Sequence, residues 1–180
     1  SGVGVVGTSS VTFTPVNDAP VVAASQGMAS AIEQVATGVD SGITVSDVDH
    51  TTLASATVSV SGGFKTGEDV LGYVNATGHG NISGSYAPAT GVLTLTSSGA
   101  TATLSQWQAA LRSITYLNTS DTPTAADRTI KWVVSDGADS SIAATRTISV
   151  KPVNDPPANR SEEHTSELQS PCNLVCRLLL

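Results

Sequence analysis

Apolar and small polar residues alternate with a period of two along much of the chain. Val, Ile, Leu or Ala at every second position takes turns with Ser or Thr, which is the signature of a strand with one buried face. The clearest runs are 43–45, 54–60, 92–96, 129–134 and 145–150. Clusters of Gly, Asp, Ser and Thr separate the runs and predict turns. About seven such strands are typical of an all-β, antiparallel β-sandwich.

One segment breaks this pattern. Residues 105–114 place Trp107, Leu111 and Ile114 on one face of a helix. Ser105 and Gln108 have the spacing of a capping box at its start. We expect a short helix whose Trp107 closes one end of the sandwich, with ligand stacking as the alternative role of that ring.

A short motif occurs twice, with an offset of 137 residues. Residues 15–20 read Pro-Val-Asn-Asp-Ala-Pro, and residues 152–157 read Pro-Val-Asn-Asp-Pro-Pro. The prolines stiffen a connection and block strand continuation, so both motifs indicate linkers. We therefore expect a tandem repeat. Its segments are the last strand of a preceding repeat (1–15), a linker (16–20), one complete repeat (21–152) and a linker to the next repeat (153–159).

The last part of the chain differs from the rest. Residues 160–170 and 173–180 match the translation of a short-read sequencing adapter, so we interpret 160–180 as an adapter-derived artefact. Both cysteines, Cys172 and Cys176, lie in this segment. The remaining body, residues 1–159, has no cysteine from which to predict a disulfide or a thiolate metal site.

The body is acidic, with a net charge of −6, and ten of its twelve acids are Asp. Such a chain lacks the basic face that nucleic-acid binding requires. It has no apolar run near the roughly 18 residues of a membrane span, so we expect no membrane insertion by this segment. Neither a G-x-S-x-G elbow nor an H-E-x-x-H motif occurs, and we expect no enzymatic activity.

The body also contains an ordered series of motifs between its linkers. The series comprises Ser46-Asp47-Val48-Asp49, residues 91–95, 107–116, 118–121 and 127–130, and Ser135-Asp136-Gly137. Together with the linkers, it resembles the cadherin-like, Ig-like tandem repeats of very large bacterial surface proteins, including RTX-type adhesins. The resemblance covers nearly all of residues 1–159. It implies a rod of repeats with calcium at the junctions, an extracellular place on the bacterial cell surface and a role in cell adhesion. The offset of 137 residues exceeds the roughly 100 of a simple sandwich repeat and leaves the path of residues 64–110 open.

Sandwich topology places the acids at the two ends of the repeat, because successive strands reverse direction. The end that meets the incoming linker gathers Asn17, Asp18, Asp47, Asp49 and Asp136. The opposite end gathers Glu33, Asp121, Asp127, Asn154 and Asp155. Ca²⁺ takes six to eight oxygen ligands, and an Asp-x-Asp pair supplies two carboxylates from one turn. We therefore predict Ca²⁺ at both junctions. The alternative is that these side chains only make Asx-turns.

Other metals fit the sequence less well. Mg²⁺ demands a tighter octahedral geometry. Zn²⁺ favours Cys or several His, and neither His50 nor His79, the two histidines of the body, has an evident ligand partner.

These observations predict a structural repeat of a large secreted or surface adhesin. Its partners are neighbouring repeats of the same chain and, beyond them, a host or cell-surface glycan or protein. One alternative is a carbohydrate- or ligand-binding module that uses residues 64–90 with exposed Tyr73 and Tyr86. Another is an accessory domain of a secreted hydrolase whose catalytic part lies elsewhere.

Overall fold

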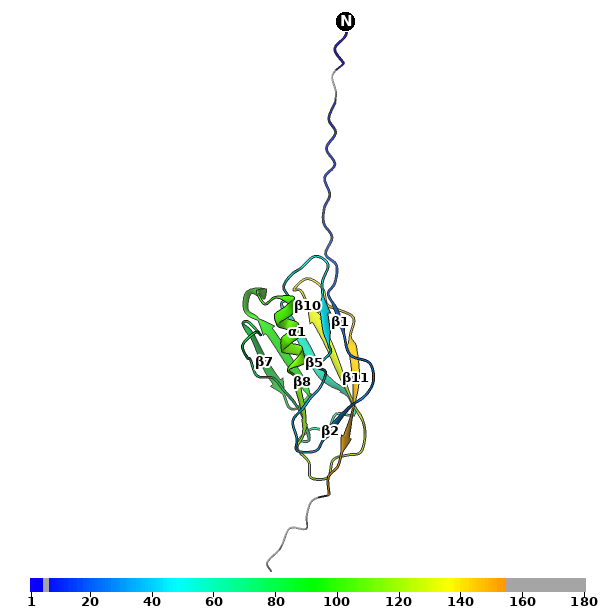
Figure 1. Ribbon diagram of the computed structural model, residues 1–180, viewed down its shortest axis with the longest axis vertical. Helices are drawn as coiled ribbons and strands as arrows, with labels where there is room; N and C mark the ends of the chain where they lie inside the picture. The colour runs from blue at the N-terminus through cyan, green and yellow to red at the C-terminus, as the bar shows by residue number, and fades with distance from the viewer. Residues whose placement is uncertain (5–6, 155–180) are drawn as a thin grey trace, which may run out of the picture.

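The computed structural model describes residues 1–4 and 7–154 of the 180 residues. Asp155 and residues 160–180 therefore lie outside the described residues, and the expectations for them stay as predictions. The described residues form a two-layered β-sandwich with one short α-helix, which confirms the predicted fold class (Figure 1). The single α-helix of the described part is far too short to cross a membrane.

The first layer is a six-stranded sheet. Its strands, in spatial order, are β2 (Ala29–Ile32), β11 (Ala144–Lys151), β10 (Arg128–Ser135), β5 (Ser55–Gly62), β8 (Val92–Ser97) and β7 (Ile82–Ala87). Neighbouring strands are antiparallel except β2 and β11, which run parallel. The parallel pairing of β11 with β2 joins the end of the repeat to its beginning.

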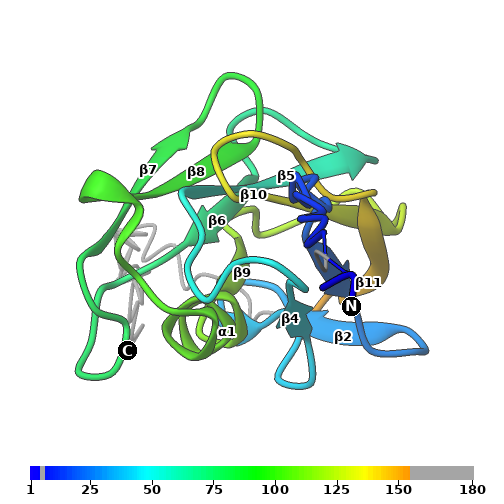
Figure 2. The same ribbon diagram turned by 90° about the horizontal axis from the view of Figure 1, so that it is seen from above.

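The second layer combines two small sheets with the helix, as the view from above shows (Figure 2). A three-stranded sheet is ordered β3 (Thr37–Gly38), β9 (Thr115–Asn118) and β6 (Asp69–Gly72), and β1 (Val21–Ala23) pairs with β4 (Thr44–Ser46). Helix α1 (Leu104–Arg112) lies beside β4 and β9. The apolar faces of both layers meet in one core that includes Trp107, Trp132, Leu53, Leu95 and Ile130.

The five clearest alternating runs contain strands β4, β5, β8, β10 and β11 as predicted, and six further strands lie outside these runs. Strands β1, β2 and β3 have two to four residues, which is too few for a period of two to be visible. Strand β7 reads Ile-Ser-Gly-Ser-Tyr-Ala and is largely exposed. The open segment 64–110 contains β6, β7 and β8, a 3₁₀ turn at Ser98–Ala100 and most of α1.

Helix α1 begins earlier than predicted. Its N-cap is Thr103, whose side chain accepts from the Gln106 N–H while the Gln106 side chain accepts from the Thr103 N–H. The capping box is therefore Thr103 with Gln106, and the prediction of Ser105 with Gln108 was wrong. Gln108 instead accepts a hydrogen bond from the Val45 N–H at 3.3 Å. The predicted apolar face is correct, since Trp107, Leu111 and Ile114 are all fully buried.

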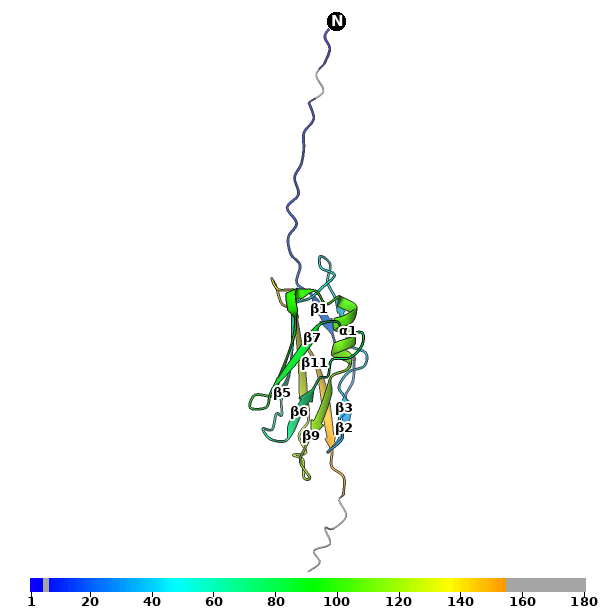
Figure 3. The same cartoon turned by 90° about the vertical axis from the view of Figure 1, so that its left-hand side faces the viewer.

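The two ends of the sandwich face the two linkers. The leading segment reaches the sandwich at one end, where β1 begins, and β11 runs to the opposite end (Figures 1 and 3). Residues 1–4 and 7–20 contain no strand. That residues 1–15 complete the sheet of a preceding repeat stays a prediction, because such a sheet would lie outside this chain.

Candidate metal centres at the two ends of the sandwich

At the end where the chain enters, the loop after β4 folds around Asp47. Its Oδ1 accepts hydrogen bonds from the N–H groups of Asp49 and His50, both at 2.8 Å. This Asx-turn follows the strand directly, so β4 fixes where the Asp47 carboxylate lies. The turn leaves the second oxygen, Oδ2, without a hydrogen-bond partner among the described residues, although the side chain is fully buried.

The loop after β10 holds Asp136 in the same way. Its Oδ1 accepts from the N–H groups of Ala138 and Asp139, both at 2.7 Å, and its Oδ2 accepts from the Asn17 amide at 3.0 Å. Desolvation works to raise the pKa of Asp136, but the backbone donors and Asn17, with His50 nearby, outweigh it and lower that pKa. The Asp136 side chain is therefore ionised and fixed in position directly after β10.

The incoming linker, residues 16–20, is hydrogen-bonded to both loops. The Asn17 amide also donates to Asp139 Oδ2 at 2.8 Å, and the Asp18 N–H donates to Asp49 Oδ2 at 2.6 Å. A hollow of about 260 Å³ lies between the linker and Asp49 and His50. The structure thus brings together all the residues predicted for this end.

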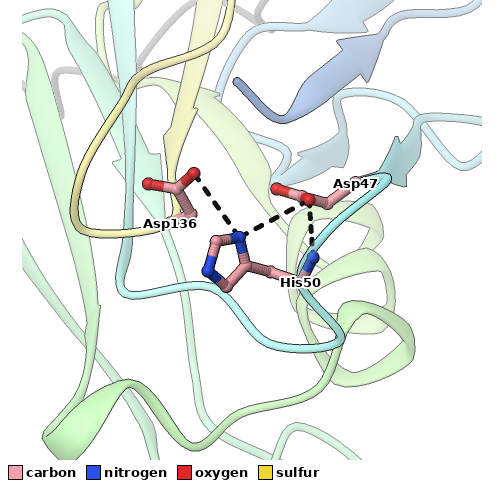
Figure 4. A group of neighbouring side chains, drawn as sticks. All are labelled: Asp47, His50 and Asp136. Carbon is pink, nitrogen blue, oxygen red and sulfur yellow. Dashed lines mark hydrogen bonds and ion pairs between the residues drawn. The ribbon is translucent and has the colours of Figure 1, made fainter. Parts of the chain in front are cut away.

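His50 completes the group, contrary to the expectation that it has no ligand partner. Its Nδ1 lies 3.7 Å from Asp47 Oδ1 and 3.8 Å from Asp136 Oδ2 (Figure 4). One ligand atom from each of the three residues falls within 4.8 Å of the others. We call Asp47, His50 and Asp136 the entry cluster. Sequence reasoning missed His50, although Asp47 lies only three residues before it and Asp136 had been placed at the same end.

Asx-turns and metal binding are compatible at this end. In Asp47, the turn oxygen Oδ1 is also the oxygen that lies 3.7 Å from His50 Nδ1, and Oδ2 has no partner among the described residues. In Asp136, Oδ1 serves the turn, while Oδ2 accepts from Asn17 and lies 3.8 Å from His50 Nδ1. The turn interpretation is correct for both residues, but neither turn uses Oδ2.

At the opposite end, Glu33 holds the outgoing linker. It is 4% exposed, and its Oε1 accepts from the Val153 N–H at 2.6 Å, while Oε2 has no partner among the described residues. The Gln34 amide donates to Asp121, and Asp121 and Asn154 line one hollow of about 460 Å³. Glu33, Asp121 and Asn154 therefore gather around the linker.

Asp127 is not drawn into this group. It is exposed, directly precedes β10, and its side chain has no hydrogen bond or ion pair within the described ranges. Asp155 lies outside the described residues, so its place at this end stays a prediction.

The aromatic residues of segment 64–90 are not free, as the binding-module alternative required. Tyr86 is half-buried and donates to the Asp69 carbonyl at 2.7 Å. Tyr73 is half-buried as well, and its ring stacks on that of His79. Both tyrosines pack against the core, and His79 is itself buried. A hollow of about 400 Å³ in this segment is lined by Tyr73 and His79, and carbohydrate binding there stays an alternative prediction.

Two buried polar groups were missed by the sequence analysis. Asp69 binds Arg128 Nε at 2.8 Å, the Tyr116 hydroxyl at 2.6 Å and the Asn118 amide at 3.0 Å. This group ties β6, β9 and β10 together, and desolvation with the hydrogen bond to Asp69 raises the pKa of Tyr116. Asp40 similarly binds Arg146.

The fold and these ends define a β-sandwich module that holds a linker with acidic side chains at each end. No family model matches the chain. It is 38% identical over 130 residues to halomucin of Haloquadratum walsbyi (strain DSM 16790 / HBSQ001), a match that covers 68% of this chain. The chain spans only about 1% of the length of that relative.

Among solved structures, the chain is similar to a chain of a type I cohesin–dockerin complex from Clostridium thermocellum. The sequence identity is 8% and the TM-score 0.43, over 74% of this chain and 100% of the other. At this level the similarity adds no argument to the fold described above.

Proposed function

We propose that residues 21–152 form a cadherin-like structural repeat of a very large extracellular surface protein, with calcium stiffening the junctions between repeats. One observation carries the proposal: the same short motif is held by acids at both ends of the sandwich. Asn17 and Asp18 bind the loops at the entry end, and Val153 binds Glu33 at the other. The role is non-enzymatic, and its partners are the neighbouring repeats.

The donors at both ends suit Ca²⁺. Clustered carboxylates repel one another unless a cation neutralises them, and Ca²⁺ accepts six to eight oxygens in flexible geometry. Asp47 Oδ2 and Glu33 Oε2 are two of the three buried carboxylate oxygens that lack a hydrogen-bond partner within the described part of the chain. Asn17, Asp18, Asp47, Asp49 and Asp136 would supply the oxygens at the entry end. Glu33, Asp121 and Asn154 would do so at the other end, with Asp155 as the predicted addition.

The similarity to halomucin supports the wider context. A match over about 1% of the relative's length fits one module of a very long protein, and the relative favours an extracellular or cell-surface location. Adhesion through the rod, to a glycan or protein, follows from the resemblance to surface adhesins and forms part of the same proposal.

Thermal unfolding of the full chain tests calcium binding. A ligand that binds only the folded state adds about 2.7 kcal/mol at about 100 times its dissociation constant. We expect the melting temperature to rise by several degrees in Ca²⁺ over chelator, and by less in Mg²⁺.

The matched variants locate the site. Asp47→Asn with Asp49→Asn should lose most of the rise. Asp127→Asn should keep it, because Asp127 is exposed and its side chain has no partner in the described part of the chain. Equal melting temperatures in Ca²⁺ and chelator would contradict calcium binding by a single repeat.

A further inference from the structure

We propose that the entry cluster binds a transition-metal dication of the Zn²⁺ class through Asp47, His50 Nδ1 and Asp136. The inference names a second class of ion for this end and does not depend on calcium binding there. An imidazole nitrogen is a good ligand for Zn²⁺, Co²⁺ and Ni²⁺, whereas Ca²⁺ takes oxygen ligands. His50 therefore gives the entry end a chemistry that the all-oxygen group around Glu33 lacks.

The distances in the cluster suit a metal better than a hydrogen bond. His50 Nδ1 lies 3.7 and 3.8 Å from the two carboxylates, beyond hydrogen-bonding distance. Ligands about 2.0–2.2 Å from a tetrahedral Zn²⁺ stand about 3.4 Å from one another. The two distances from His50 Nδ1 exceed that spacing by a few tenths of an ångström, and all three ligand atoms lie within 4.8 Å of one another.

A separate observation points to a missing cation. The Asp47 side chain is fully buried, yet its Oδ2 has no partner among the described residues. Asp47 Oδ1 is occupied by the turn and by the approach of His50, and the other oxygen is directed toward Asp136 (Figure 4). A buried carboxylate oxygen without a donor is costly. A dication between the two carboxylates would satisfy this oxygen and reduce their repulsion.

The cluster is preorganised on one side and open on the other. Asx-turns hold Asp47 and Asp136 at the ends of β4 and β10, so neither carboxylate needs to be ordered when the ion binds. The His50 side chain remains 43% exposed, which gives the ion a route in and leaves room for a water ligand. Asn17 Nδ2 donates to the Asp136 oxygen that faces the cluster, so binding there would act on the linker as well.

Titration with Co²⁺ and Zn²⁺ tests the inference. The full chain should carry Cys172→Ser, Cys176→Ser and His164→Gln, because these residues could bind the same ions outside the cluster. We expect one Co²⁺ per chain, with visible absorption bands that Zn²⁺ abolishes by displacement. His50→Gln should weaken Zn²⁺ binding at least tenfold, whereas His79→Gln, at a histidine away from the cluster, should not.

Calcium responses separate this inference from the proposed function. His50→Gln should keep the calcium-dependent rise in melting temperature, and Asp47→Asn should lose both that rise and Zn²⁺ binding. Zn²⁺ binding without any calcium response would contradict only the proposed function. Zn²⁺ affinity unchanged in His50→Gln, or no Co²⁺ bound by the background chain, would overturn the inference.

Discussion

Asp40 is 1% exposed, and its carboxylate is surrounded by donors from three parts of the chain. It accepts from the Ser25 N–H and hydroxyl at 2.7 and 2.6 Å, from the Gly42 N–H at 2.9 Å, and it pairs with Arg146 at 3.1 Å. Desolvation works to raise the pKa of Asp40, but these donors and Arg146 outweigh it and lower that pKa. The ionised form is therefore the one that the fold stabilises.

The lowered pKa of Asp40 predicts acid sensitivity. Because the folded pKa lies below the unfolded value of about 3.9, the stabilisation is fully present above that value and is lost as the pH falls through the folded pKa. Urea unfolding at pH 7 and pH 3 should show a smaller loss of stability for Asp40→Asn than for the natural sequence. An equal loss in both proteins would contradict this assignment.

The buried residues also show what sequence reasoning could and could not reach. The acids near the linkers were placed correctly at the entry end because the alternation of strand directions is visible in the sequence. The pair Asp69–Arg128 was not visible, since it joins residues more than fifty positions apart. No local spacing distinguishes such an acid from one in a solvated turn. The pair His50–Asp136 was missed because attention went to the acids alone at this end.

Among the elements, α1 takes the place of a strand in the second layer. β4 pairs with β1 along one edge, and side chains of α1 form hydrogen bonds to the backbone at the other edge. Gln108 accepts from the Val45 N–H, and Arg112 Nε donates to the Ile43 carbonyl at 3.0 Å. Trp107, fully buried, donates from Nε1 to the Leu53 carbonyl at 3.0 Å, so the ring is a core residue and is not available for ligand stacking. The apolar face of the helix was predictable, but these partners were not.

The position of the capping box predicts a difference between two neighbouring hydroxyls. Thr103→Ala removes the N-cap of α1 and should lower the free energy of unfolding by about 1 kcal/mol. Ser105→Ala changes a residue inside the first turn and should cost less than about 0.5 kcal/mol. Chemical denaturation of the two variants measures both values. A larger loss in Ser105→Ala would contradict the cap assignment.

At the scale of the whole molecule, the two copies of the linker motif are held at different residues of the motif. Val153 at the outgoing end corresponds to Val16 at the incoming end, through the offset of 137 residues. The outgoing linker is held at Val153 by Glu33, and the incoming linker is held at Asn17 and Asp18, the next two residues of the motif. In a tandem array, consecutive linker residues would thus be held by different repeats, with no free residue between them.

A two-repeat protein tests whether this junction is stiff. Joining Pro152 directly to Val16 of a second copy keeps the motif intact, so the junction would contain Glu33 of the first repeat and the entry cluster of the second. We expect small-angle X-ray scattering in Ca²⁺ to show one extended shape, because cations bridging the acids would fix the two repeats.

A chelator, or Asp47→Asn with Asp136→Asn in the second repeat only, should broaden the distribution of interatomic distances that the scattering gives. The same changes in the first repeat, whose entry end faces no neighbour, should leave the junction stiff. Identical scattering in Ca²⁺ and chelator would show that the hydrogen-bonded linker alone sets the rigidity of the array.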